Sequence, residues 1–474
     1  MERKTRFELA TLSLARRCST AEPLPPVTGA EAQNRTGDTR IFSPLLYRLS
    51  YLGTEFIVAS EQPGCQSTSP SSPTMLYWLA MRRRVFGLNP NVFFLGVVSL
   101  LTDVSSEMIF TLVPLFLCNV LGAATTVVGL VGGVSESADA LLWIFSGWFS
   151  DRVRKRKPLA VLGYSISTIA KPFMYLASSW VSVLAIRFGD RLGKGIRTPS
   201  RDALVADSVS AKERGRGFGL HRAMDTSGAV LGLALAAVII YFLQGGGLEL
   251  NLKTYQWLIV VGAVPAVLAV LVLLFFVHER KPPAAPQLPR IRLGGFDTRF
   301  KLFLIVMAVF TLGNSSDFFV ILRAQNLGSS VFYVVLMLVL FNITYAVTSL
   351  PAGVLSDRLG RRGVIAAGWS IYALVYLGFA LASAQWQVWL LFAGYGVYYG
   401  MAEGVARAFV ADLVPVEKRG TAYGLYHGVV GLALLPASLI AGWLWEAVNP
   451  AAPFLFGAAL AFIAMVGIMG LVRE

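Results

Sequence analysis

Charged residues stand inside long apolar stretches of this chain, where an ionisable side chain is costly. Between residues 181 and 206, their spacing places them within roughly 140° of arc on one helix face. The set is Arg187, Asp190, Arg191, Lys194, Arg197, Arg201 and Asp202. A charge inside a membrane costs about 2.5–3.5 kcal/mol on insertion scales, so this face must meet water, a solute or countercharges. We therefore expect it to line a solute pathway.

Other apolar stretches carry polar residues at spacings of three or four, which place each group on one helix face. The groups are Asp103 with Glu107, Asn314 with Asp317, and Tyr399 with Glu403 and Arg407. A carboxylate in a dry cavity is suited to carry a proton, because burial disfavours its charged form. The candidate carriers are, in order, Glu107, Asp103, Asp190 and Glu403. Additional polar candidates are Glu136, Asp139 and Lys171.

The residue types for other chemistries are missing from the sequence pattern. The cysteines Cys18, Cys65 and Cys118 lack metal-ligand spacing, and no Ser/His or paired-His constellation for an intramembrane enzyme is found. Residues 189–195 imitate a phosphate-binding loop, but the spacing is one residue short and no Ser or Thr follows Lys194. We expect no enzyme activity, no metal, no cofactor and no ATP binding.

Composition indicates that membrane-spanning helices position these residues. Hydrophobic residues make up 55% and charged residues 14% of the 474-residue chain, which is too apolar for soluble domains. A span needs about 20 mostly apolar residues, and from residue 91 such stretches follow one another closely. Twelve helices are predicted, at residues 91–118, 126–150, 159–178, 181–206, 217–243, 255–277, 300–324, 330–355, 364–384, 386–411, 421–446 and 451–472.

The net charge of +14 would suit a nucleic-acid partner, but its location argues against one. Residues 1–80 contain eight Lys/Arg and seven Asp/Glu, which leaves +13 for the remainder. That excess lies near 152–157, 280–301 and 358–362, whereas the alternate connections contain a single basic residue, Lys253. The asymmetry predicts that both ends of the membrane domain are cytoplasmic. We expect a bacterial-type inner (plasma) membrane protein that binds no nucleic acid.

Residues 1–84 have a different character from the rest of the chain. They are rich in Pro, Ser, Thr and Arg and only weakly periodic, so we expect an extension that is disordered. A further hypothesis is that native translation begins at Met81, because Arg82, Arg83 and Arg84 follow it and lead directly into the first span. The extension would then not belong to the native protein.

The chain repeats itself at an offset of 205 to 210 residues. Asp151 corresponds to Asp357, and Asp207 corresponds to Asp412. Six spans in each half give the halves the same orientation, which predicts a parallel repeat with the solute site near the membrane midplane. The expected parts are a first half at 85–277, a cytoplasmic central loop at 278–299 and a second half at 300–474.

The loop after the second span of each half resembles the loop motif of the major facilitator superfamily, Gly-x-x-x-Asp-Arg/Lys-x-Gly-Arg/Lys-Arg/Lys. The second half contains all of it, in Gly353, Asp357, Arg358, Gly360, Arg361 and Arg362. The first half contains Gly147, Asp151, Arg152, Lys155 and Arg156, with Arg154 in the place of the second Gly. Residues 187–195 are similar to the family's fourth-helix motif, with Asp190 and Arg191 replacing its Gln and first Gly.

The resemblance covers residues 85–474 and implies an all-α integral membrane protein with twelve transmembrane helices in two six-helix parallel repeats. It also implies that the first, fourth, seventh and tenth spans line a central cavity. Arg187 corresponds to the family's arginine that is often implicated in proton coupling. An alternative is that Asp190 neutralises Arg187 and Arg191, so that the three form a structural cluster.

The motif loops are expected to act as gates. Asp151 and Asp357 can pair with nearby cations or cap a helix, and Gly147 and Gly353 can permit close helix packing. Their role would be to set the balance between inward-open and outward-open states. The alternative is that these loops only fix topology. The gating candidates are Gly147, Asp151, Arg152, Gly353, Asp357, Arg358, Arg361 and Arg362.

We predict a secondary transporter, coupled to protons or another ion, that moves a small organic solute by alternating access. Efflux is slightly favoured as the direction, only because it is common in the superfamily. The alternatives are an uptake permease for an anionic metabolite or metal chelate and, in a different class, a membrane sensor or scaffold. An arginine fork suits a carboxylate or phosphate, so we expect an anionic or zwitterionic solute and a monomer in lipid. The transport and coupling candidates are Asp103, Glu107, Arg187, Asp190, Arg191, Lys194, Asp317, Glu403 and Arg407.

Overall fold

The computed structural model describes residues 88–153, 155–210, 213–279, 295–415 and 418–471, without the side chains of 143–153 and 471. Two predictions therefore lie outside the described residues. They are those on the N-terminal extension and on most of the central loop. The remaining chain is helical, and its elements are given below in chain order.

The first repeat consists of six spans. Its elements are α4 (Pro90–Phe110) continued by α5 (Val113–Leu115) and η1 (Phe116–Val120), then α6 (Thr125–Val153), α7 (Arg156–Phe173) with η2 (Met174–Leu176), α8 (Trp180–Asp207), α9 (Arg214–Gln244) and α10 (Leu252–Phe276). The second repeat consists of α11 (Thr298–Gly313) with α12 (Phe318–Asn326), α13 (Val331–Leu359), α14 (Arg361–Leu381), α15 (Gln385–Asp412), α16 (Arg419–Ala447) and α17 (Ala452–Leu471). The twelve predicted spans are confirmed, with boundaries within four residues.

The prediction of a continuous helix is wrong in the first and seventh spans. The first span is interrupted at Thr111 and Leu112, just before Pro114, and the seventh is interrupted from Asn314 to Asp317. Short polar residues favour such a break, because their side chains bond to nearby backbone groups in place of the helical ladder. Here the Ser316 hydroxyl accepts the Phe318 N–H at 3.4 Å, and the Ser316 N–H donates to Ser438 Oγ at 3.1 Å.

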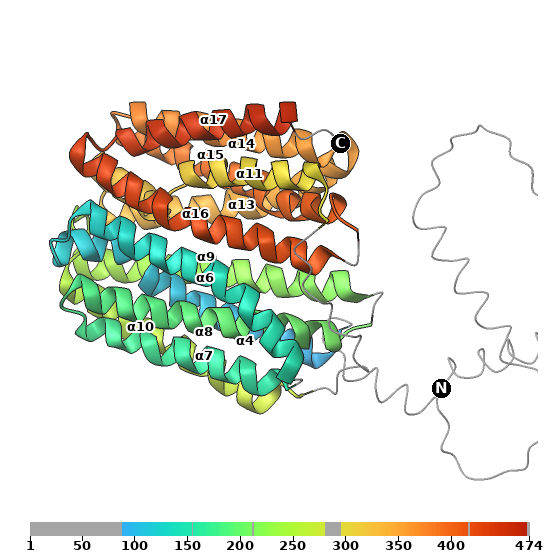
Figure 1. Ribbon diagram of the computed structural model, residues 1–474. Coiled ribbons are helices and arrows are strands. Elements are labelled where there is room, and N and C mark those ends of the chain that lie inside the picture. Colours follow the sequence, from blue (N-terminus) through green and yellow to red (C-terminus); the bar gives the residue numbers. More distant parts are fainter. Residues whose placement is uncertain (1–87, 154, 211–212, 280–294, 416–417, 472–474) are drawn as a thin grey trace, which may run out of the picture. The chain divides into compact units, whose positions relative to one another are not determined.

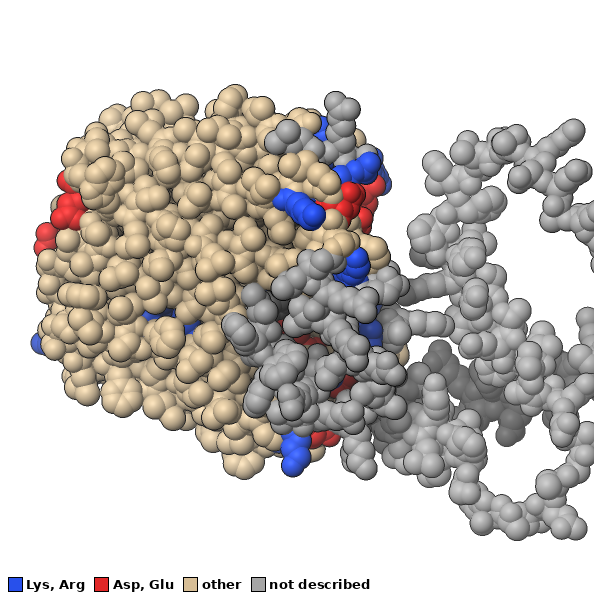
Figure 2. All heavy atoms as spheres, in the orientation of Figure 1, with Lys and Arg blue, Asp and Glu red and all other residues tan. Residues whose placement is uncertain are grey.

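Nine helices in the described part of the chain are long and apolar enough to cross a membrane on length and composition alone. The other three spans, α6, α8 and α15, have 29, 28 and 28 residues, so they are equally long. They carry many of the chain's intramembrane charges, which is why composition alone does not select them. Figure 2 shows a broad tan face almost without charged residues, with Lys, Arg, Asp and Glu gathered toward the helix ends.

The two repeats pack alike. In the first, α4 packs on α9 and α10, α8 on α6 and α7, and α7 on α10. In the second, the corresponding helices make the same pairs: α11 packs on α16 and α17, α15 on α13 and α14, and α14 on α17. The repeats meet where α6 packs on α16 and α9 on α13, as Figure 1 shows for helices far apart in sequence. The internal repeat predicted from sequence is thus confirmed in three dimensions.

Helices α7 and α8 approach each other closely at a pair of glycines. A Cβ atom added to Gly163 would lie 2.6 Å from the Gly193 carbonyl oxygen, and one added to Gly193 would lie 2.6 Å from the Gly163 oxygen. Small residues allow backbones in membranes to pack at this range. The contact fixes α8, and with it the charged face, against its own repeat.

The two ends of the helices differ. We call the end with the connections near 154–155, 208–213, 360 and 413–418 the basic end, and the other the opposite end. At the opposite end the repeats are tied together: Gln325 Nε2 donates to the Leu248 carbonyl at 2.7 Å, and the Thr126 hydroxyl donates to Glu446 at 2.7 Å. The Val331 N–H adds a bond to the Gly247 carbonyl at 3.3 Å. The repeats are therefore closed against each other at the opposite end.

Arg323 in α12 is a buried structural cation that caps α14. Its guanidinium donates to the carbonyls of Phe379, Ala380 and Ala382 at 3.0, 3.3 and 3.2 Å, at the point where that helix ends. The last carbonyls of a helix have no partner within the helix, so the arginine satisfies groups that lipid would leave unbonded.

Replacing Arg323 with methionine should destabilise the second repeat without touching the charged residues between the repeats. Leaving buried carbonyls unsatisfied costs about 1–3 kcal/mol. We expect a lower thermal unfolding midpoint for the purified protein in detergent, measured by tryptophan fluorescence. The matched control is Arg299→Met, because the Arg299 side chain is exposed. Equal midpoints for the two variants would contradict the capping role.

Candidate functional site

The charged face of α8 lies largely in the interior, and Lys194 has its most exposed side chain. The helix begins with a capping box in which the Ser179 hydroxyl accepts the Ser182 N–H at 3.3 Å. Farther along, Arg187 is 4% exposed, and the side chains of Arg191 and Lys194 are 16% and 39% exposed. Farther toward the basic end the exposure falls again, to 6% at Arg197.

Two of the α8 cations share one carboxylate of α6. Asp139 Oδ2 lies 2.8 Å from Lys194 Nζ and 3.5 Å from Arg191 Nη1, and Asp190 Oδ2 lies 3.6 Å from Arg191 Nε. Neutralisation by Asp190, which the sequence left open as an alternative, therefore applies to Arg191. Asp190 also lies within electrostatic range of Arg187, but the Arg187 Nε and Nη1 have no hydrogen-bond partner among the described residues.

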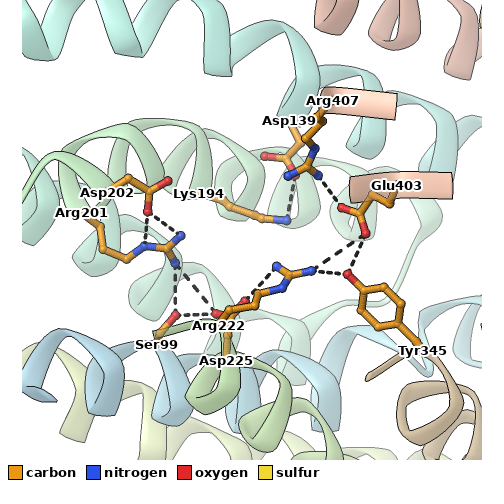
Figure 3. A network of polar contacts seen from close by, with 10 residues as sticks. All are labelled: Ser99, Asp139, Lys194, Arg201, Asp202, Arg222, Asp225, Tyr345, Glu403 and Arg407. Atoms are coloured by element: carbon orange, nitrogen blue, oxygen red, sulfur yellow. Dashed lines mark hydrogen bonds and ion pairs between the residues drawn. The ribbon is translucent and has the colours of Figure 1, made fainter. Parts of the chain in front are cut away.

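A second group of charges joins the two repeats, as Figure 3 shows. Arg222 of α9 donates to the Tyr345 hydroxyl of α13, and its Nη2 lies 3.9 Å from Glu403 Oε2 of α15. The Tyr345 hydroxyl donates to Glu403 at 2.8 Å, and Arg407 forms an ion pair with the same carboxylate. The predicted pair of Glu403 and Arg407 is thus brought together, and it is linked to the first repeat.

The network continues into the first repeat through Asp225, one turn after Arg222. Asp225 accepts from the Ser99 hydroxyl at 2.6 Å and lies 3.4 Å from Arg222 Nη1. Arg201 Nη1 donates to Ser99 Oγ at 3.1 Å and lies 4.0 Å from Asp225. Asp103, a predicted coupling residue, lies against Asp225. A chain of polar contacts therefore runs from α4 and α8 across to α13 and α15.

Arg222 and Asp225 are the residues that sequence reasoning missed. They stand three apart in the apolar stretch at 217–243, which is the signal that singled out Asn314 and Asp317. Tyr345 carried no such signal, because one tyrosine in an apolar helix is ordinary. The expectation that the first, fourth, seventh and tenth spans line the centre is incomplete, because α6, α9 and α13 also contribute.

The broken seventh span forms a third group, which faces both repeats. The Ser316 hydroxyl donates to Glu136 of α6 at 2.6 Å. The adjacent Asp317 accepts from the hydroxyls of Tyr395 at 2.6 Å and Tyr399 at 3.3 Å, both on α15. Within the described residues, neither carboxylate forms an ion pair. The break thus lies between its own Asp317 and Glu136 of α6, two carboxylates whose hydrogen-bond partners are neutral hydroxyls.

Glu107 and Lys171 lie on the wall formed by α4 and α7. Glu107 accepts from the Thr111 hydroxyl at 2.5 Å and lies within electrostatic range of Arg187, Arg191 and Lys194. Lys171 is fully buried, and its Nζ donates to Ser105 Oγ at 2.9 Å and the Thr102 carbonyl at 3.4 Å. The carboxylate that ranked first as a proton carrier thus faces the cations of α8.

The motif loops lie at the basic end. Arg361 bonds to Asp357 and to Asp412, each at 2.9 Å, and Arg362 donates to the Met469 carbonyl. Arg358 is exposed. In the first half, Arg156 forms the counterpart ion pair with Asp207, at 2.7 Å. The surroundings of Gly147 and the side chains of Asp151 and Arg152 lie outside the described part of the structure.

The expectation of close helix packing at Gly353 is wrong for this state. A Cβ atom added there would find nothing within 4 Å. The physical reason is that the described contacts between the repeats lie at the opposite end and midway, not at the basic end. Asp357 does pair with a cation, as expected.

Comparisons with known proteins agree with this architecture. An uncharacterized MFS-type transporter of Methanocaldococcus jannaschii is 40% identical over 383 residues, which cover 79% of this chain and 93% of that protein. The multidrug resistance protein MdtH of Photorhabdus laumondii is 31% identical over 151 residues, covering 32% of this chain and 37% of that one. A mutant of the nucleoside transporter NupG has a similar fold, with a TM-score of 0.67 at 14% identity over 81% of this chain and all of that chain.

The family assignment follows from both halves at once. The sequence model of the Major Facilitator Superfamily matches residues 95–322 and 302–474, which together span the two repeats. The members of that family are integral membrane proteins that carry small solutes across membranes. With twelve spans in two parallel repeats and charged groups between them, this chain belongs to the Major Facilitator Superfamily.

Proposed function

We propose that this protein is a proton-coupled secondary transporter that moves a small anionic or zwitterionic organic solute by alternating access. The observation that carries the proposal is the polar network that links charged residues of α8 and α9 to Tyr345 and Glu403 of the second repeat, while the repeats are tied together at the opposite end. Charged groups thus lie between two repeats that hydrogen bonds join at one end. A solute bound there would be exchanged with one side of the membrane at a time.

The positive-inside asymmetry supports placing the basic end in the cytoplasm, so that the structure represents an inward-open state. The ion pairs of Arg361 with Asp357 and Asp412, and of Arg156 with Asp207, lie at that end, each within one repeat. We propose that these pairs set the balance between the two states. The partial likeness to MdtH supports efflux as the direction. Uptake of an anionic metabolite or metal chelate is the alternative.

Proton coupling is proposed to run through Glu107. Its hydrogen-bond partner is the neutral Thr111 hydroxyl, and three cations of α8 lie within electrostatic range. A proton on Glu107 removes a negative charge that otherwise attracts those cations. The cations then bind an anionic group more strongly, so proton and solute bind together and cross in the same direction. With an inward proton gradient, coupling of this kind favours the uptake alternative.

Flux through proteoliposomes tests this proposal, using a solute first identified by thermal stabilisation of the purified protein. A transporter moves the solute down its gradient and responds to an imposed pH gradient. Replacing Glu107 with glutamine should abolish the response to the pH gradient while allowing exchange. The control is Glu249→Gln, an exposed residue at the opposite end. A surviving pH response in the Glu107 variant would place the proton carrier elsewhere, and no flux of any binding solute would favour a sensor or scaffold.

A further inference from the structure

Arg187 is one of two buried arginines of α8 with unused hydrogen-bonding capacity among the described residues; the other, Arg197, lies over the Tyr164 ring within its own repeat. The guanidinium carbon of Arg187 lies 4.6 Å from the centre of the Phe110 ring and 5.8 Å from that of Phe318. Its Nε and Nη1 donate to nothing in the described part of the chain. Ring faces attract a cation, but they do not replace the two hydrogen bonds that a carboxylate or phosphate accepts from a guanidinium. A buried charge in this condition can accept a partner from a bound solute, and Arg187, unlike Arg197, also lies beside a ring of the second repeat.

Asp317 is the complementary group in the second repeat. Its carboxylate accepts only from the hydroxyls of Tyr395 and Tyr399, and no cation within the described ranges lies at ion-pair distance. The Tyr399 ring lies 5.3 Å from Phe341 and 6.1 Å from Tyr345, measured between ring centres. A carboxylate beside aromatic rings is a combination that binds organic ammonium groups.

Arg187 and Asp317 have two neighbours in common, Phe318 and Glu136. Phe318, one of the rings beside Arg187, is the residue after Asp317, so the break in the seventh span brings them close. Glu136, bonded to Ser316, lies within electrostatic range of both Arg187 and Asp317. Arg187 comes from the first repeat and Asp317 from the second. A molecule that bonds to both would therefore span the two parts that move during alternating access.

We propose that the solute is a zwitterion whose anionic group binds Arg187 and whose ammonium group binds Asp317 and the tyrosines around it. This proposal rests on the proposed function, which places the solute site between the repeats. It narrows the expected solute from anions and zwitterions to zwitterions. An anion alone would leave Asp317 unpaired. A cation alone would leave Arg187 unpaired. Only a molecule with both charges satisfies both groups and draws the repeats together.

Two matched sets of probes test this with the full-length protein, by thermal stabilisation and by isothermal titration. One set has adjacent charges on an aromatic frame: L-phenylalanine, 3-phenylpropionate and phenethylamine. The other has separated charges: 5-aminopentanoate, pentanoate and pentylamine. In at least one set the zwitterion should bind about tenfold or more tightly than the matched anion and amine, because each lost charged hydrogen bond weakens binding by about that factor. Equal binding of the anion, equal binding of the amine, or no binding of either zwitterion would overturn the proposal.

Two substitutions assign the ends of the solute. Asp317→Asn should remove the preference for the zwitterion over the matched anion, and Arg187→Gln should remove its preference over the matched amine. The control is Asp297→Asn, because Asp297 is exposed and asparagine retains its capping bond to the Thr298 N–H. An Asp317→Asn protein that keeps the full preference would contradict the assignment. If a variant does not fold, the binding of the matched probes to the wild-type protein still tests the proposal.

Binding does not require transport, so this test is independent of the flux experiment. Transport of a solute without an ammonium group would refute the zwitterion and leave the transporter standing. Zwitterion binding without flux would support the zwitterion site and refute the transporter function.

Discussion

Glu403→Arg should reduce transport at least tenfold, and the double exchange Arg222→Glu with Glu403→Arg should recover much of the loss. Arg222 lies on α9 and Glu403 on α15, so their contact links helices of different repeats. The single reversal places a third cation beside Arg222 and Arg407, which disfavours the state seen here. A shift of about 1.4 kcal/mol between two states changes their ratio tenfold.

Initial flux rates in proteoliposomes measure this effect, with the amount of folded protein determined in parallel. The matched control is Glu249→Arg, which reverses an exposed charge outside the network. A single variant with normal flux would show that the contact is incidental. A double variant no better than the single one would show that Glu403 acts through Arg407 or Tyr345 instead of Arg222.

Gly193→Val should nearly abolish folded protein. The Cβ of the new side chain would lie 2.6 Å from the Gly163 carbonyl oxygen and 2.8 Å from the Ser167 N–H nitrogen, and neither backbone atom can move without separating α7 from α8. Overpacking of this kind costs about 1–3 kcal/mol, and a clash with backbone lies at the upper end of that range. Both the yield of monodisperse protein and its unfolding midpoint should fall.

Gly219→Val is the control for this substitution. Gly219 is also helical, and an added Cβ atom would meet nothing within 4 Å. Each variant replaces a helical glycine with the same β-branched residue, so the change in intrinsic helix propensity is matched. A Gly193 variant as well behaved as the Gly219 variant would show that α7 and α8 are not held by their close approach.

The spans were predictable because hydropathy reports burial in lipid, and lipid leaves the backbone few structures other than a helix. Even α8 was found, since its charges fall on one face. The break at Asn314–Asp317 was not foreseen, because the sequence shows polar residues there but not the Ser438 hydroxyl that replaces a helical partner. Hydrogen bonds between distant helices decide such local outcomes.

The sequence predicted which residues belong to the candidate site better than it predicted which of them form ion pairs. Arg187, Arg191 and Lys194 are equivalent in sequence, as cations on one helix face. In the structure Asp139 of α6 neutralises the latter two and leaves Arg187 unpaired. Which cation remains available depends on how α6 lies against α8, and helix spacing within one span carries no information on that.

The paired loops at the basic end show how a duplicated half diverges. Alignment places Lys155 opposite Arg361, yet the residue that bonds to the corresponding aspartate, Asp207, is Arg156. One residue, Gly360 with φ of +89°, separates α13 from α14, whereas two residues separate α6 from α7. Because the connection between α6 and α7 is one residue longer, the cation that pairs with the aspartate is Arg156, one position later than alignment with Arg361 would give. The ion pair is therefore present in both halves, although its cation stands at positions that do not align. Mutagenesis guided by aligned positions would change Lys155 and miss Arg156, the partner of Asp207.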